Sequence, residues 1–123
     1  MKVLIYGVGL AGRQVYKEIK NKVQVIGFLD SDPDKKGRVI TDGLLCLGGP
    51  DCLSEVDFDQ IQITSLFFRE IKKALLESQI PEEKITVNLP EEPISEIRNS
   101  WLSCYAKLLK DTQYAVAEGG VFQ

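Results

Sequence analysis

The feature that most constrains this chain is a glycine-rich turn close to its start. The first residues read MKVLIYGVGLAGRQVYKEI, in which the apolar run Lys2–Tyr6 is followed by three glycines within six residues. A short apolar run that ends in glycine is typical of a buried parallel strand. Apolar residues then recur every four positions at Ala11, Val15 and Ile19, which predicts a helix with one buried face. The chain is therefore expected to begin with a strand, a tight turn and a helix.

A turn in this position is either a phosphate-binding site or only a corner between a strand and a helix. In a binding site, Gly7 allows the sharp turn, Gly9 lets the backbone approach a pyrophosphate, and Gly12 lets the helix pack on the strand. The N-terminus of the helix directs unpaired N–H groups at the phosphates. We favour binding, and the expected contacts in this segment are Gly7, Gly9, Leu10, Gly12 and Arg13.

Polar residues at the ends of two further predicted strands extend this candidate site. Asp30 follows the strand Val23–Leu29 and stands eighteen residues after the last glycine, where a carboxylate accepts hydrogen bonds from ribose hydroxyls and repels a 2′-phosphate. Alternatively, Asp30 is a strand-ending aspartate that caps its own turn. Thr64 and Ser65 end the fourth predicted strand, where ligands of open α/β sheets bind, although both types of residue also cap helices.

The first 92 residues alternate between strand and helix patterns. After a segment of turn residues, the apolar runs predict strands at Leu44–Leu47, Phe58–Thr64 and Ile85–Leu89, with a helix at Phe67–Ser78 between the last two. Alternating glutamines in the fourth strand, FDQIQIT, indicate that one of its faces is less deeply covered. This alternation predicts an α/β fold, a doubly wound parallel five-stranded sheet of strand order 3-2-1-4-5.

The periodicity changes after Pro93. Apolar residues spaced by three and four predict a long amphipathic helix from about Ile94 to Lys110. We therefore divide the chain into a nucleotide-binding domain at residues 1–92, a linker or docking helix at 93–111, and the start of a further domain at 112–123. The apolar stripe of the helix at 94–110 is a candidate surface for a homodimer.

The composition excludes several functions. The net charge is −3 and the sequence contains no basic patch, so we expect no binding to nucleic acid. No run of apolar residues is long enough to span a membrane, and we expect a cytoplasmic protein. Histidine is absent and the three cysteines lack C-x-x-C spacing, which argues against a metal site. No general base is paired with a nucleophile, so no catalytic residue is expected.

One stretch of the sequence resembles a broad group of Rossmann-like domains. In VIGFLDSDPDKKGRVITDGLLCLG, an apolar strand is followed by a GF-D-DP-K-G pattern, as in the N-terminal domains of nucleotide-sugar dehydratases, the sugar-recognition domains of sugar acyltransferases, and NADH-sensing repressors. The resemblance covers roughly the first 90 residues. It implies that Gly7, Gly9, Gly12 and Asp30 hold NAD(H) or a nucleotide-sugar. The alternative is an interaction domain in which the turn is a relic.

The last residues, RNSWLSCYAKLLKDTQYAVAEGGVFQ, resemble the entry into a macrocin-O-methyltransferase-type domain. The resemblance implies that Glu118, Gly119 and Gly120 begin a pocket for S-adenosylmethionine, which would be a cofactor of a longer parent protein only. We expect the first 123 residues to be a binding module that does not itself transfer a methyl group. The alternative for this segment is a frayed polar tail.

Overall fold

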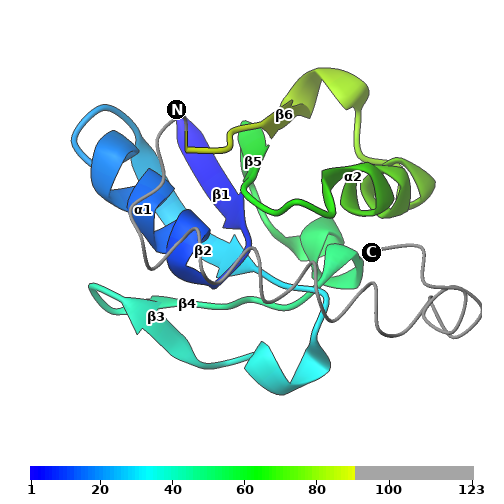
Figure 1. Ribbon diagram of the computed structural model, residues 1–123. Coiled ribbons are helices and arrows are strands. Elements are labelled where there is room, and N and C mark those ends of the chain that lie inside the picture. The colour runs from blue at the N-terminus through cyan, green and yellow to red at the C-terminus, as the bar shows by residue number, and fades with distance from the viewer. Residues whose placement is uncertain (91–123) are drawn as a thin grey trace, which may run out of the picture. The chain divides into compact units, whose positions relative to one another are not determined.

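The protein is described here by a computed structural model, in which residues 1–90 form an α/β domain (Figure 1). The chain divides into two units, Met1–Glu92 and Pro93–Gln123. The amphipathic helix expected at 94–110 and the segment 112–123 lie outside the described residues. The helices and strands of the described part, in chain order, are β1 (Lys2–Tyr6), α1 (Leu10–Ile19), β2 (Gln24–Leu29), β3 (Val39–Thr41), β4 (Leu44–Leu45), β5 (Gln60–Ile63), α2 (Phe68–Glu77) and β6 (Ile85–Val87).

Four parallel strands form the central sheet, in the order β2-β1-β5-β6. Tyr6 at the end of β1 lies opposite Leu29 of β2 on one side and Ile63 of β5 on the other. The carboxyl ends of these three strands therefore meet at one edge of the sheet. The relative order expected for the first, second, fourth and fifth strands is confirmed, because α1 and α2 make crossovers in opposite directions from the middle of the sheet.

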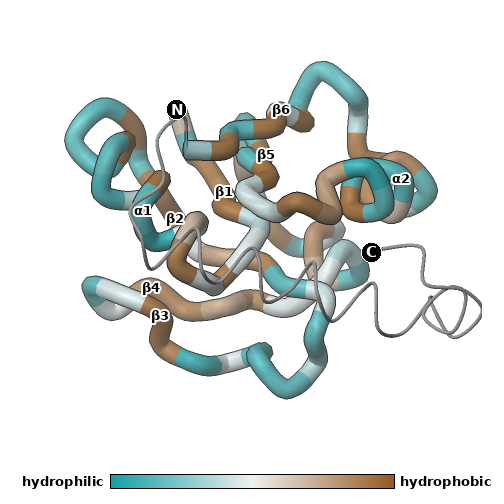
Figure 2. The backbone as a smooth tube through the Cα atoms, in the orientation of Figure 1, coloured by the Kyte–Doolittle hydropathy of each residue, from teal (hydrophilic) through white to brown (hydrophobic). Residues whose placement is uncertain are grey.

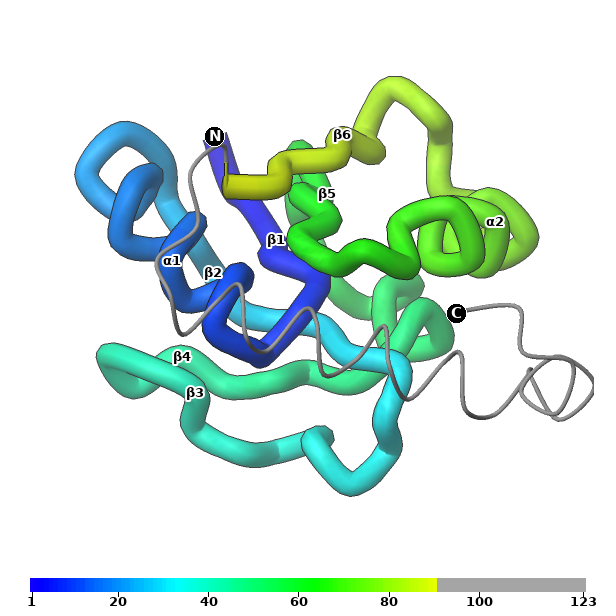
Figure 3. The backbone as a smooth tube through the Cα atoms, in the orientation of Figure 1, coloured from blue at the N-terminus to red at the C-terminus, as the bar shows by residue number. Residues whose placement is uncertain are grey.

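The third expected strand differs from the prediction. Leu44–Leu45 pairs antiparallel with Val39–Thr41 in a separate hairpin, and only Cys46 continues as a parallel bridge to Phe28 of β2. The turn Asp42-Gly43 has positive φ at both residues, 49° and 77°, as a two-residue hairpin turn requires. The parallel sheet of the described residues therefore has four strands instead of five, with the hairpin beside β2 (Figure 3).

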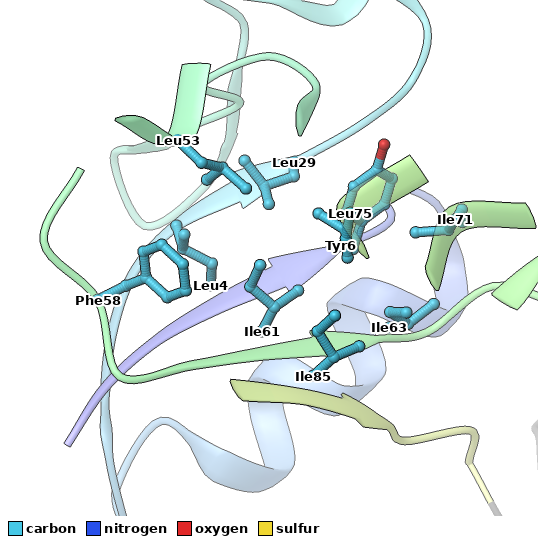
Figure 4. Packing of buried hydrophobic residues seen from close by; sticks show 10 residues of the cluster. All are labelled: Leu4, Tyr6, Leu29, Leu53, Phe58, Ile61, Ile63, Ile71, Leu75 and Ile85. Atoms are coloured by element: carbon cyan, nitrogen blue, oxygen red, sulfur yellow. The ribbon is translucent and has the colours of Figure 1, made fainter. Parts of the chain in front are cut away.

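Each face of the sheet carries its own core. The core against α2 is shown in Figure 4 and consists of Leu4, Tyr6, Leu29, Leu53, Phe58, Ile61, Ile63, Ile71, Leu75 and Ile85. The core against α1 consists of Ile5, Val8, Val15, Tyr16, Phe28 and Cys46. The buried runs of β1 and β2 are hydrophobic, whereas α1 and α2 mix hydrophobic and hydrophilic residues (Figure 2). A doubly wound sheet is stabilised in this way because parallel strands bury both faces.

The alternating glutamines of β5 form a ladder of side-chain hydrogen bonds. The amide of Gln60 donates to Thr86 Oγ1 of β6 at 2.9 Å, and the amide of Gln62 donates to Gln60 Oε1 at 3.0 Å. Asn88 completes the ladder by donating to Gln62 Oε1 at 2.8 Å. Both glutamines are half-buried. This face of the strand is less deeply covered than its apolar face, as the alternation predicts, and its polar groups satisfy one another.

Shorter helical turns connect these elements. They are 3₁₀ helices at Pro33–Lys35, Pro50–Glu55 and Glu82–Lys84. Across residues 1–90, none of the helices combines the length and the apolar character that a membrane span requires.

Two neighbouring leucines of α2 provide a test of this packing. Leu75 is fully buried, whereas Leu76 is 41% exposed. Leu75→Ala should lower the free energy of unfolding by about 2–5 kcal/mol, because it removes buried methyl groups and leaves a cavity. Leu76→Ala should change it by less than about 0.5 kcal/mol. Urea unfolding followed by circular dichroism measures both, and equal effects of the two variants would contradict the described orientation of α2.

Candidate functional site

The glycine-rich turn joins β1 to α1 at the carboxyl edge of the sheet. Gly7 has a φ of 129°, a conformation that side chains disfavour, and its N–H donates to Leu29 O at 2.8 Å. Gly9 is the N-cap of α1, with no side-chain cap. The first hydrogen bond of the helix runs from Arg13 N–H to Gly9 O at 3.1 Å. The turn is therefore held at the end of β2 and opens directly into the helix.

The three glycines of the turn have different surroundings. A Cβ added at Gly7 would lie 2.5 Å from Thr64 Oγ1, and one at Gly12 would overlap the carbonyl oxygen of Gly7. A Cβ added at Gly9 would meet no atom within 4 Å. Gly7 and Gly12 are thus required by the close approach of strand, turn and helix. Gly9 faces open space, and the packing of the described residues does not explain why a glycine stands there.

The first turn of α1 presents unpaired backbone donors beside Gly9. The N–H groups of Leu10, Ala11 and Gly12 precede the first intrahelical hydrogen bond, so the helix leaves them without a partner. The first turn contains no acidic residue, and Arg13 is exposed just behind it. Leu10 is 38% exposed at the same position. The positive end of the helix dipole favours an anion at this position, and Arg13 adds a positive charge to the same turn of the helix.

Asp30 lies at the end of β2 and is half-buried. One carboxylate oxygen, Oδ1, accepts the N–H of Asp32 at 2.9 Å. Asp30 therefore caps its own turn, which is the alternative role that the sequence suggested. Its own N–H donates to Gly48 O at 3.0 Å. Among the hydrogen bonds of residues 1–90, none uses the second oxygen, Oδ2. Capping occupies one oxygen and is compatible with a ligand contact at the other.

Thr64 packs against the glycine-rich turn at Gly7 and Gly12. It is 2% exposed, and both its N–H and its hydroxyl donate to the carbonyl oxygen of Tyr6, each at 3.0 Å. The adjacent Ser65 accepts the N–H of Phe67 at 3.1 Å, whereas the N-cap of α2 is Phe67, which makes no side-chain cap. The hydroxyl of Thr64 is thus engaged within the protein, and its expected contact with a ligand stays a prediction.

Tyr6 is a residue of this region that sequence reasoning missed. Its ring is buried in the core against α2, and its hydroxyl lies 2.7 Å from Ser31 Oγ. Burial raises the pKa of Tyr6 above its ordinary value, and the nearby charge of Asp30 adds to this effect. The phenol therefore stays neutral at physiological pH. The only signal in the sequence was a polar tip on the last residue of an apolar strand.

The structure thus brings most of the predicted residues to one edge. Gly7, Gly12 and Thr64 are in direct contact, and Asp30 is linked to them through β2. The turn after β1 and the loop after β5 run side by side there (Figure 3). Gly9, Leu10 and Arg13 form the outer rim.

The titratable groups of the described residues offer little other chemistry. Residues 1–90 hold no cluster of three side chains suited to bind a metal ion. Cys46 and Cys52 are free thiols, and burial raises the pKa of each, so both are less reactive than an exposed cysteine.

These features define a class of α/β domain, one with a parallel sheet and a glycine-rich turn between its first strand and first helix. The chain belongs to the family described as C2185-like, N-terminal, whose model matches residues 1–86. The match covers the four parallel strands almost completely and includes the whole glycine-rich turn. No curated protein matches the chain.

The glycines yield a second test. Gly12→Ala should lower the free energy of unfolding by about 3 kcal/mol, because the new Cβ meets backbone that cannot move independently, although alanine is otherwise the better helix former. Gly9→Ala should change it by less than about 1 kcal/mol, since its φ of −79° suits any residue. Thermal unfolding of both variants measures the difference. Equal stability of the two would contradict the described packing of the turn.

Proposed function

We propose that this domain binds the diphosphate of a nucleotide, either NAD(H) or a nucleotide-sugar. The observation that carries the proposal is the contrast among the three glycines. Two are explained by contacts within the protein, while Gly9 leaves open space in front of the uncapped N-terminus of α1. A diphosphate is the group that uses such a space, because it needs a close approach of the backbone and several N–H donors.

Asp30 supports a ribose beside the diphosphate. Its Oδ1 is engaged in its own turn, and Oδ2 is the oxygen that would accept from the ribose hydroxyls. A 2′-phosphate in the same place would be repelled by the carboxylate. The proposed ligand is therefore a nucleotide with an unmodified ribose. NAD(H) and UDP-sugars both meet this description, and the domain is proposed as a binding module without catalytic residues of its own.

Calorimetric titration of the whole chain with NADH, UDP-glucose and ADP-ribose tests the proposal. At least one should bind, and Gly9→Ala should weaken its binding about tenfold, because the Cβ occupies the space of the diphosphate at a cost of about 1–3 kcal/mol. NADPH should bind more weakly than NADH.

The control is the stability of Gly9→Ala, measured on the same samples. A folded variant with weakened binding locates the ligand at the turn. If the wild-type chain binds none of the three nucleotides, the proposal fails. If Gly9→Ala binds as well as the wild type, the ligand lies elsewhere.

We further propose that the domain is the N-terminal part of a larger methyltransferase that modifies sugars or polyketides. Two observations support this: the matching family is described as N-terminal, and residues 112–123 resemble the first strand of a macrocin-O-methyltransferase-type domain. The 123-residue chain should not bind S-adenosylmethionine in a calorimetric titration, because the resemblance covers only the first strand of that domain. Binding at micromolar affinity would contradict the proposal that only the larger protein holds a complete pocket for S-adenosylmethionine.

A further inference from the structure

The loop after β2 is anchored to the core of the domain through Tyr6. The ring of Tyr6 lies among the apolar residues of the α2 core, and its hydroxyl points away from them (Figure 4). There it meets Ser31 Oγ at 2.7 Å. Ser31 is exposed, whereas Tyr6 is 2% exposed. An exposed hydroxyl is thus paired with the hydroxyl of a side chain whose ring is buried in the core.

The residue beside Ser31 is Asp30, the proposed ribose contact. Within the loop, Asp30 Oδ1 accepts from Asp32 N–H and Asp32 Oδ1 accepts from Asp34 N–H, each at 2.9 Å. These bonds shape the loop internally and do not tie it to the sheet. The ties to the rest of the domain include Asp30 N–H to Gly48 O and the hydroxyl pair. Farther along the loop, Gly37 N–H donates to Cys46 O at 2.8 Å and Cys46 N–H donates to Arg38 O at 2.9 Å. The hydroxyl pair is the side-chain tie next to Asp30, and it comes from the core against α2.

The other contacts of Tyr6 connect it to the glycine-rich turn. Its carbonyl oxygen accepts both hydrogen bonds from Thr64, and the next residue in the chain is Gly7. One residue therefore touches the diphosphate turn through its backbone and the ribose loop through its side chain. The turn and the start of the loop are also joined directly, because Gly7 N–H donates to Leu29 O at 2.8 Å.

We propose that Tyr6, through Ser31, is a positioning residue that sets the carboxylate of Asp30 and thereby the selectivity for an unmodified ribose. The inference rests on the proposed function. Without the hydroxyl pair, the backbone tie from Asp30 N–H to Gly48 O remains, but the loop loses its side-chain tie beside Asp30, and the carboxylate is held less firmly against a 2′-phosphate. The affinity for NADH then falls because the hydrogen bonds to the ribose are less well aligned. The affinity for NADPH falls less, because the repulsion between Asp30 and the 2′-phosphate is also relieved.

Titration of Tyr6→Phe with NADH and NADPH tests this inference. Phenylalanine keeps the buried ring and removes only the hydroxyl. NADH should bind about fivefold more weakly, the effect of one neutral hydrogen bond, and the ratio of NADH to NADPH affinity should fall. Ser31→Ala, at an exposed position, should give the same change, and the double variant should add nothing further, because both substitutions remove one interaction.

Tyr16→Phe is the matched control. The Tyr16 hydroxyl also makes a 2.7 Å hydrogen bond, to Asp42 Oδ2 of the hairpin turn, which lies outside the proposed site. This variant should leave the affinity ratio unchanged. General destabilisation would weaken both nucleotides equally, so the ratio separates positioning from stability.

The outcomes distinguish the two proposals. If the wild-type chain binds UDP-glucose in place of NADH, the same comparison uses UDP-glucose and its 2′-deoxy form, and discrimination should again fall in Tyr6→Phe. An unchanged ratio in both Tyr6→Phe and Ser31→Ala overturns the positioning role while nucleotide binding stands. Failure of the wild-type chain to bind any of these nucleotides overturns nucleotide binding, and the positioning role with it.

Discussion

The close approach of three backbone segments at the end of β1 determines the arrangement of this domain. The carbonyl of Gly7 lies against the Cα of Gly12, and the carbonyl of Tyr6 accepts two hydrogen bonds from Thr64. A side chain at Gly12 would push α1 away from the turn, and one at Gly7 would collide with Thr64. Because β1 lies between β2 and β5, a displacement here would also move the two neighbouring strands. The candidate site is therefore a direct product of the packing that holds the sheet and α1 together.

The same arrangement explains why the domain can be rigid in its core and open at its edge. Backbone groups at the carboxyl ends of β1, β2 and β5 are hydrogen-bonded to one another, through Gly7 to Leu29 and Thr64 to Tyr6. The first N–H groups of α1 follow Gly9 and make no hydrogen bond within the helix, and a Cβ at Gly9 would meet open space. Donors held by such a scaffold need little reorganisation when an anion arrives. This is the physical basis on which we propose a diphosphate as ligand.

Much of this fold follows from sequence patterns, and the exceptions have identifiable causes. The four parallel strands and both helices were predictable because each is a distinct apolar run with the period of its element. The hairpin strand Val39–Thr41 was missed because turn-forming residues surround it, although the Asp42-Gly43 pair between apolar residues is a hairpin signal. In the site, the glycines and Asp30 were predictable from spacing. The inward hydrogen bond of Thr64 and the Tyr6–Ser31 pair join residues far apart in the chain, and no local pattern encodes them.

The ladder of polar side chains on β5 and β6 bears on how the sheet ends. In residues 1–90, β6 is a three-residue strand with a sheet neighbour on one side only. So short a strand gains little from its backbone pairing, and alternative registers differ little in energy unless side chains discriminate among them. Thr86 and Asn88 meet the glutamines of β5 only in the observed alignment. A slip by one residue would turn both toward the apolar face and leave the amide of Gln60 and Oε1 of Gln62 without these partners. The ladder thus selects the register of the last strand, at an edge where hydrophobic contacts alone would allow other registers.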